Sequence, residues 1–275
     1  MTVAEALRAA TVRLRAGGID SAPRDARLLL AEAIGCPPDR LTLLAHEALD
    51  AAAADTFDAM LASRLRRRPV SQILGRRLFW NRSFAVTSDV LDPRPETETL
   101  IGAALAGPAP ASILDLGTGS GVILLTLLAE WPDARGIGTD LSAPALAVAA
   151  GNAQELGLAA RARFLRADWF AGITGHFDLV VCNPPYIAAA EVERLSPEVR
   201  DWEPRAALTA GPTGLEAYHR IAARLGSVLA PGGRALFEFG AGQDADVGAI
   251  FQEQGFTVAG FHEDLDGRKR VIEII

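Results

Sequence analysis

The tetrapeptide Asn183-Pro184-Pro185-Tyr186 combines residue types that could bind and activate a planar NH2 group. Two consecutive prolines donate no hydrogen bonds and cannot continue a central strand, so they favour a fixed extended turn. In such a turn the Asn183 side-chain carbonyl and the Pro184 backbone carbonyl can accept both protons of the NH2 group, and Tyr186 can stack on its plane. Holding both N–H bonds lets the nitrogen lone pair localise toward an electrophile. We interpret all four residues as a catalytic, substrate-binding turn.

A second segment, Asp115-Leu116-Gly117-Thr118-Gly119-Ser120-Gly121, is typical of a ligand-binding loop between a strand and a helix. Its glycines allow tight turns and close approach of a ligand to the backbone, in front of a helix N-terminus. Nineteen residues after Gly121, Asp140 ends the next predicted strand, where a carboxylate can bind ribose hydroxyls. Val122 replaces the last glycine of a nicotinamide loop, and the spacing instead resembles the S-adenosylmethionine loop of class I methyltransferases. The predicted cofactor-binding residues here are Gly117, Thr118, Gly119, Ser120, Gly121 and Asp140.

Asp168-Trp169-Phe170 follows the third predicted strand at the same edge of the sheet. Asp168 could accept a hydrogen bond from an exocyclic amine, and Trp169 could cover a purine face. The alternative is an aromatic plug under the sheet. We predict that Asp168 and Trp169 also bind the cofactor.

These motifs lie in a region where short apolar runs alternate with helical patterns. Such alternation predicts an α/β fold with a doubly wound, Rossmann-like parallel sheet that binds ligands at the strand carboxyl ends. We expect helices at 122–130, 143–156, 215–229 and 242–254. Seven strands are expected at 112–116, 135–139, 163–167, 177–182, 234–239, 256–260 and 268–274, the last two forming a closing antiparallel pair.

Residues 1–75 show no convincing strand and predict a small helical bundle, which we assign as a substrate-docking domain. Thr2 and Glu5 form a capping-box pattern at the start of the first helix. Arginines 64, 66, 67 and 68 follow the last helical pattern. They are interpreted either as a solvated helix C-terminus or as a docking patch for an acidic partner. Residues 76–92 are predicted to be an extended or hairpin linker, with 79–90 extended, and residues 93–275 the catalytic domain.

The composition excludes several classes of protein. The 275 residues carry a net charge of −7, with 10 basic and 9 acidic residues in 1–75 and 17 basic and 25 acidic in the remainder, which argues against nucleic acid as a partner. No apolar run is long enough for a membrane span, and no secretory signal pattern is evident. Two cysteines cannot form a disulfide framework. We expect a cytoplasmic, monomeric protein without a metal site.

Together the motifs resemble those of the peptide chain release factor glutamine N5-methyltransferases. The tetrapeptide is shared by methyltransferases that act on planar nitrogens. Three further stretches carry the closer resemblance: Gly75–Trp80 with Pro93–Glu98; Val199–Arg200 with Glu203-Pro204, Ala207-Leu208, Gly211 and Gly214-Leu215; and Asp266-Gly267 with Arg270-Val271. Asp92 departs from the family's commoner apolar residue before Pro93.

This resemblance covers nearly the whole chain. It implies that S-adenosylmethionine binds at Gly117–Gly121, Asp140, Trp169 and Asn183, and is converted to S-adenosylhomocysteine. It also implies that Asn183–Tyr186 hold the glutamine of the release factors' Gly-Gly-Gln motif, so that release factors are the protein partner and translation termination is the process modulated. From the residues themselves, Arg94, Glu96 and Glu98 either order a loop over the cofactor or form ion pairs that join the domains.

Three alternatives remain open. A DNA adenine methyltransferase would share the tetrapeptide but should have a basic cleft, which the acidic charge of 76–275 disfavours. A sibling enzyme could methylate a glutamine of a ribosomal protein and would differ in the N-terminal domain. A cofactor-binding adaptor without activity would not need an intact Asn-Pro-Pro-Tyr turn.

Overall fold

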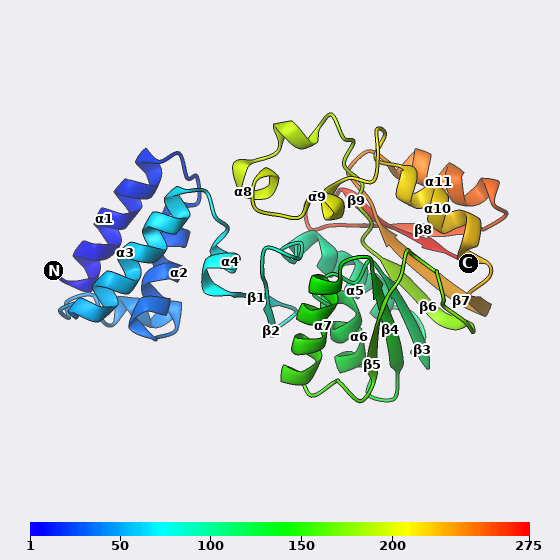
Figure 1. Ribbon diagram of the computed structural model, residues 1–275, viewed down its shortest axis with the longest axis horizontal. Helices are drawn as coiled ribbons and strands as arrows, with labels where there is room; N and C mark the ends of the chain where they lie inside the picture. The colour runs from blue at the N-terminus through cyan, green and yellow to red at the C-terminus, as the bar shows by residue number, and fades with distance from the viewer. The chain divides into compact units, whose positions relative to one another are not determined.

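The computed structural model describes residues 1–275, which form two compact units. The first unit comprises Met1–Arg76 and Ser196–Trp202, and the second Arg77–Leu195 and Glu203–Ile275 (Figure 1). The chain therefore returns to the first unit for seven residues after the Asn-Pro-Pro-Tyr turn, which the sequence did not predict. No helix is both long and apolar enough to cross a lipid bilayer.

The first unit is helical, as predicted. Its elements are α1 (Val3–Ala16), α2 (Ala22–Ile34), the 3-10 helix η1 (Pro38–Thr42), α3 (Ala51–Leu65), α4 (Val70–Leu74) and α8 (Pro197–Arg200). The capping box is confirmed, because Thr2 Oγ1 accepts from Glu5 N and Glu5 Oε2 accepts from Thr2 N. The short helix α4 was not predicted.

Two of the four arginines at the end of α3 form ion pairs within this unit. Arg64 is buried and ion-paired with Asp25 at 2.7 Å and with Glu198 at 2.9 Å. Arg67 pairs with the other oxygen of Glu198 at 2.9 Å. Glu198 lies in the returning segment 196–202, so this segment neutralises two of the four arginines. Arg64 and Arg67 therefore do not support the interpretation of this cluster as a docking patch.

Trp202, the last residue of the returning segment, binds this segment to the helical bundle. Its Nε1 donates to the carbonyl of Arg66, and the Arg68 guanidinium lies 5.6 Å from its ring centroid. Gln72 in α4 donates to the Trp202 carbonyl at 2.9 Å. The Arg66 side chain is exposed and makes no hydrogen bond or ion pair.

The second unit is built on a seven-stranded sheet, which confirms the predicted fold class. Its strands are β3 (Ser112–Leu116), β4 (Arg135–Asp140), β5 (Ala162–Arg166), β6 (Phe177–Cys182), β7 (Leu229–Glu238), β8 (Val258–Glu263) and β9 (Lys269–Ile274). The strand order is β5-β4-β3-β6-β7-β9-β8. The first five strands are parallel, and β9 runs antiparallel to both β7 and β8. The order reverses beside β3, which places a ligand crevice at its carboxyl end.

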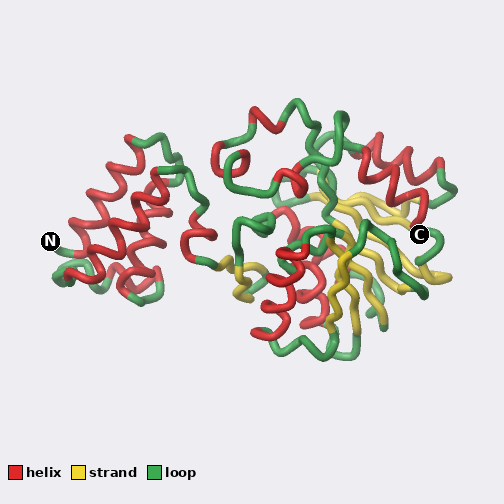
Figure 2. The backbone as a smooth tube through the Cα atoms, in the orientation of Figure 1, coloured by secondary structure: helices red, strands yellow, loops and turns green.

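Helices cover both faces of this sheet (Figure 2). The helices of the second unit are α5 (Glu98–Leu105), α6 (Val122–Glu130), α7 (Ala143–Glu155), α9 (Arg205–Leu208), α10 (Glu216–Leu225) and α11 (Asp244–Glu253), with the 3-10 helices η2 (Pro95–Thr97) and η3 (Val192–Arg194). Ile113 packs with α5 and α6, whereas Leu114 packs with α10 and α11. Alternate residues of β3 thus enter two separate cores, which explains its continuous apolar run. Helix α5 was not predicted.

The predicted hairpin is present within the predicted linker 76–92, although its first strand begins before the stretch 79–90 that was expected to be extended. Strands β1 (Arg76–Phe79) and β2 (Arg82–Ala85) are joined by Trp80 and Asn81, both with positive φ, at 46° and 58°. Two such residues form the tight turn that suits a two-residue hairpin, so Trp80 is a turn residue rather than extended. Asn152 in α7 holds this hairpin, since its Oδ1 accepts from Ala85 N at 2.7 Å.

Candidate active site

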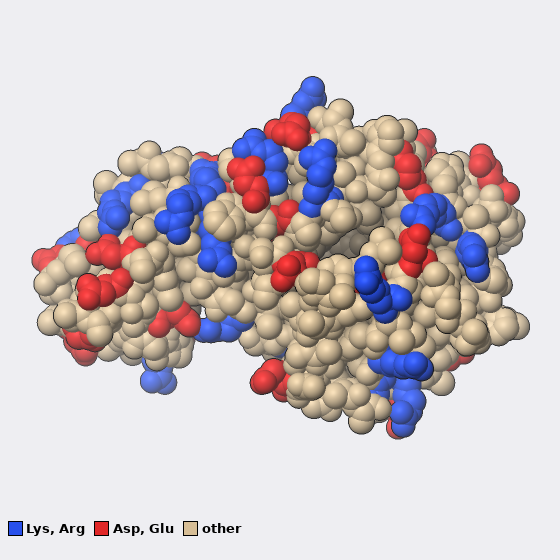
Figure 3. Space-filling view, viewed as in Figure 1, with Lys and Arg blue, Asp and Glu red and all other residues tan.

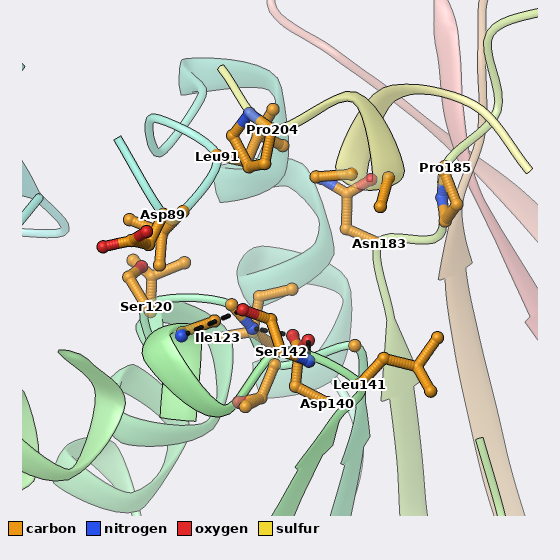
Figure 4. A pocket seen from close by; sticks show the side chains of 18 of the residues that line it. Asp89, Leu91, Ser120, Ile123, Asp140, Leu141, Ser142, Asn183, Pro185 and Pro204 are labelled. Carbon is orange, nitrogen blue, oxygen red and sulfur yellow. Dashed lines mark hydrogen bonds between the residues drawn. The ribbon is translucent and has the colours of Figure 1, made fainter. Parts of the chain in front are cut away.

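A cavity of about 260 Å³ opens at the carboxyl ends of β3, β4, β5 and β6. On the face shown in Figure 3, the surface is hollowed between α9 and this end of the sheet. Figure 4 shows Asn183 and Pro185 on one side of the cavity, Asp89 and Ser120 on the opposite side, and Asp140 and Ser142 on its floor. The residues that line it come from the glycine loop, the ends of the strands, the first turns of α6 and α7, and the segments 89–97 and 204–207.

The glycine loop lines this cavity as predicted. Gly117, Thr118, Gly119 and Ser120 all lie on its wall. Gly117 and Gly119 have φ of 65° and 55°, which favour glycine, and no atom lies within 4 Å of a Cβ placed on Gly119. Gly121 does not line the cavity, because its Cα faces α7: a Cβ there would lie 3.2 Å from that of Ala149.

Asp140 joins the glycine loop to the next βα turn. Its Oδ2 accepts from Gly119 N at 3.0 Å, and its Oδ1 accepts from Ser142 N at 2.8 Å (Figure 4). Each carboxylate oxygen can accept a second hydrogen bond, so the side chain keeps acceptor capacity toward the cavity.

Asp115 lies beneath the loop and does not line the cavity. The Thr118 hydroxyl donates to its Oδ2, whereas its Oδ1 has no partner. Burial raises the pKa of Asp115 to about 7, the hydrogen bond from Thr118 opposes this shift, and the nearby Asp140 charge adds to it. Asp115 therefore supports the glycine loop, and its negative charge lowers the stability of the folded protein because it is buried.

The structure separates the two residues predicted after β5. Trp169 lines the cavity, has φ of 54°, and carries a buried Nε1 without a hydrogen-bond partner. A strained backbone and an orphaned donor at one residue are typical of a binding site. Asp168 is exposed, does not line the cavity, and pairs with Arg220 of α10. The predicted contact of Asp168 with an exocyclic amine is therefore not supported by its position.

The Asn-Pro-Pro-Tyr turn follows β6 directly, and two of its residues, Asn183 and Pro185, line the cavity. The Asn183 Nδ2 donates to Thr97 Oγ1 at 3.3 Å, and its Oδ1 has no partner in the protein. Pro184 is buried and does not line the cavity, yet its carbonyl accepts no hydrogen bond from the chain. Two acceptors of neighbouring residues are thus left unsatisfied.

Tyr186 does not line the cavity, contrary to the stacking role expected for it. Its hydroxyl points toward Glu238 Oε1, at 3.5 Å, and its carbonyl accepts from Gln243 Nε2 at 3.1 Å. Burial raises the pKa of the Tyr186 hydroxyl, and the nearby Glu238 charge adds to this shift. The side chain packs with the core that contains α10 and α11, where it supports the turn from behind.

The segment Pro93–Glu98 encloses the cavity. Arg94 Nη2 contacts both carboxylate oxygens of Glu203 at 2.7 Å, and both residues belong to the second unit. The pair connects the segments 89–97 and 204–207, which both line the cavity. Burial raises the pKa of Glu203 to about 7, the Arg94 charge opposes this shift, and the Asp92 charge adds to it. The Arg94–Glu203 pair therefore lies within one unit and orders the loop that encloses the cavity. This favours the interpretation of Arg94 as a loop-ordering residue over that of an ion pair that joins the domains.

Sequence reasoning missed three buried polar residues near the cavity. Asn152 donates to the Ser120 carbonyl at 2.9 Å and so fixes the glycine loop to α7. Thr97 lines the cavity beside Asn183, and Glu238 lies behind the turn. The only signal for Glu238 was an acidic residue inside an apolar strand, since Ala235–Phe239 is otherwise apolar. No group of His, Cys, Asp and Glu side chains is arranged to hold a metal ion.

Comparison with known proteins matches both parts of the chain. Residues 5–75 match a family model described as the PrmC N-terminal domain, and residues 95–196 match the methyltransferase small domain. A release factor glutamine methyltransferase from Cereibacter sphaeroides is 54% identical over 99% of this chain and 98% of its own length. One from Rhodospirillum rubrum is 44% identical over 94% of this chain and 81% of its own. A solved methyltransferase from Pyrococcus furiosus shares the fold, with a TM-score of 0.53 at 13% identity, over 70% of this chain and 87% of that one.

Proposed function

This chain belongs to the release factor glutamine methyltransferase family and is an S-adenosylmethionine-dependent methyltransferase, and we propose that it methylates the side-chain nitrogen, N5, of the glutamine in the Gly-Gly-Gln motif of peptide chain release factors. The observation that carries the proposal is the Asn-Pro-Pro-Tyr turn, which presents the unsatisfied Asn183 Oδ1 at the wall of the cavity, with the unsatisfied Pro184 carbonyl next to it in the chain. Family membership favours this substrate over the DNA adenine and adaptor alternatives.

The residues around the cavity fit S-adenosylmethionine. Gly119 leaves its side-chain position open, Asp140 keeps acceptor capacity for ribose hydroxyls, and Trp169 offers a ring and an unpaired donor. The bound cofactor supplies a methyl group on a sulfonium. Asp168 and Gly121 are not part of this cofactor-binding set, because neither lines the cavity.

The chain's own contribution to methyl transfer is to bind and polarise the glutamine amide. Asn183 Oδ1 and the Pro184 carbonyl each accept one N–H of the substrate NH2 group. Holding both bonds lets the nitrogen lone pair localise, and the two dipoles stabilise the positive charge that develops on that nitrogen. Pro185 fixes the backbone of the turn, and Tyr186 fixes it from behind. The nitrogen becomes acidic only after the transfer, so no strong base is needed beforehand.

Mass spectrometry of purified release factors incubated with enzyme and S-adenosylmethionine tests this proposal. We expect one added methyl group on the Gly-Gly-Gln glutamine. A substrate with glutamine replaced by glutamate keeps the side-chain length but has no NH2 group, so it should remain unmodified. Methylation at another residue, or none at all, would refute the assignment.

Asn183→Ala is the matched test of the catalytic residue. Removing one preorganised acceptor should lower kcat about 10²–10³-fold. Because the substitution leaves the glycine loop and Asp140 intact, the cofactor should still bind, which calorimetry can measure. Full turnover by this variant would contradict the role given to Asn183.

A further inference from the structure

A buried carboxyl group lies directly behind the catalytic turn. Cys182 of β6 pairs with Phe237 of β7, so Asn183 and Glu238 follow as neighbours at the ends of these two strands. Glu238 is 1% exposed, and its Oε1 receives the Tyr186 hydroxyl. A buried acidic residue with no salt-bridge partner needs an explanation, because burying its charge is costly.

Thr97 connects this carboxyl group to the catalytic asparagine. It is 2% exposed and lies between the two residues. Its Oγ1 accepts from Asn183 Nδ2 at 3.3 Å, and its side chain interacts with the Glu238 carboxyl group, whose buried Oε2 has no hydrogen-bond partner. One hydroxyl thus lies between an amide that can face either way and a carboxyl group that only accepts when it is ionised.

The carboxylate determines the direction of every hydrogen bond in this chain of contacts. An ionised carboxylate only accepts, so it directs the proton of the Thr97 hydroxyl toward Glu238. Its lone pairs are then left to accept from the NH2 of Asn183. The Asn183 carbonyl oxygen must in consequence point away from Thr97. A reversed amide would present NH2 to the substrate NH2, with two donors facing one another.

We propose that Thr97 and Glu238 are positioning residues that hold the Asn183 side chain with its Oδ1 toward the substrate amide. The inference rests on the proposed function, since it assigns Asn183 Oδ1 the acceptor role. Thr97 and Glu238 act through Asn183, and neither is required to touch the transferred methyl group.

The ionisation of Glu238 makes this arrangement sensitive to pH. Burial raises its pKa to about 7, Thr97 and the Arg270 charge oppose this shift, and the Glu96 charge adds to it. The other titratable groups that interact with it are the phenols of Tyr186 and Tyr218 and the thiol of Cys182, whose pKa values are all raised by burial. Below about pH 7 the protonated carboxyl can donate to Thr97, and the direction of the bonds is lost. The kcat of the wild type should rise with pH through this region.

Thr97→Val tests the hydroxyl while preserving shape. We expect kcat to fall about 10–10²-fold, as for a misplaced catalytic group, with an unchanged Kd for S-adenosylmethionine. Thr97→Ser restores the hydroxyl and should recover most of kcat. Thr126→Val is the matched control, because Thr126 is equally buried in α6, its hydroxyl has no partner, and it does not line the cavity. It should keep the wild-type kcat.

Glu238→Gln tests the carboxylate through the pH profile. The variant should fold, shown by an unchanged circular dichroism spectrum, and should lose the rise of kcat near pH 7. The Thr97→Val and Glu238→Gln double variant should be about as slow as Thr97→Val alone, because both act through one chain of contacts. Full wild-type kcat in Thr97→Val, or an unaltered pH profile in a folded Glu238→Gln, would overturn the inference.

The two proposals fail in different ways. If the wild-type enzyme leaves the glutamine unmodified, the proposed function is wrong. If the wild type methylates it and Asn183→Ala does not, but Thr97→Val keeps full kcat, only the positioning role is wrong.

Discussion

A Cβ atom placed on Gly214 would lie 2.3 Å from the carbonyl oxygen of Tyr186. Gly214 also has a φ of 78°, so it meets both a steric and a conformational requirement for glycine. The backbone next to it is tied to the turn, because Ile187 N donates to Leu208 O and Ala189 N to Gly211 O, each at 3.0 Å. The segment 208–214 therefore forms the back wall of the catalytic turn.

Gly214→Ala should consequently reduce catalysis by moving the turn. A shift of about 1 Å in a catalytic group costs on the order of 10²-fold in rate, and we expect a loss of kcat of that size. Gly232→Ala is the matched control, since Gly232 has a φ of 77° but no atom within 4 Å of its Cβ position. Both variants should lose some stability from backbone strain. If steady-state assays give them the same kcat, the Tyr186 contact does not matter for catalysis.

Arg67→Glu should destabilise the first unit. The change places a carboxylate beside Glu198, whose burial raises its pKa but whose hydrogen bonds, including those from Arg64 and Arg67, lower it overall. We expect the free energy of unfolding to fall by about 1–3 kcal/mol in urea titrations, because a partly buried charge keeps only Arg64 of its two partners and gains a like charge beside it.

Arg66→Glu separates docking from structure in the same cluster. The Arg66 side chain is exposed and without a partner, so its reversal should leave the free energy of unfolding unchanged. We expect the KM for the release factor to stay near the wild-type value as well. A raised KM with unaltered stability would instead restore a docking role, confined to Arg66.

Asp115→Asn should make the protein more stable at high pH. Because burial raises the pKa of Asp115 to about 7, the folded protein binds more protons than the unfolded chain between about pH 4 and 7. This group's contribution to the free energy of unfolding therefore falls as pH rises through that window. The variant should gain stability relative to the wild type from pH 5 to pH 7 and remain constant above it.

Asp178→Asn is a control of opposite sign for that measurement. Burial raises the pKa of Asp178, but hydrogen bonds from Ser112 and Ala111 outweigh it and lower the pKa overall. Its stabilising contribution is complete above the unfolded value near 4 and is lost only at lower pH. Between pH 5 and 8 this variant should show a constant loss of stability. A constant effect of Asp115→Asn over the same range would contradict the raised pKa of Asp115.

The alternation of apolar runs and helical patterns was enough to predict the sheet and most of its helices. Strands β3 and β6 lie where their apolar residues predicted them. A strand that is buried on both faces has a continuous run of apolar residues, which makes it recognisable in the sequence. Because the carboxyl ends of parallel strands meet at one edge, the glycine loop, Asp140 and Asn183 could be predicted to line one site. The resemblance to a family added the substrate, which the residues alone defined only as a planar NH2 group.

Side-chain partners were decided only by the tertiary structure, because they come from elements distant in the sequence. Asp168 follows a strand as a binding residue would, yet Arg220 of α10 draws it away from the cavity. The arginines at the end of α3 resemble a solvated cluster until Glu198, over 130 residues later, pairs with two of them. Thr97 carries no local signal and Glu238 only that of an acidic residue in an apolar strand, since each acquires its role from a residue on another element. Periodicity within a segment reports which face is buried, whereas the group that meets a polar side chain depends on how distant segments pack.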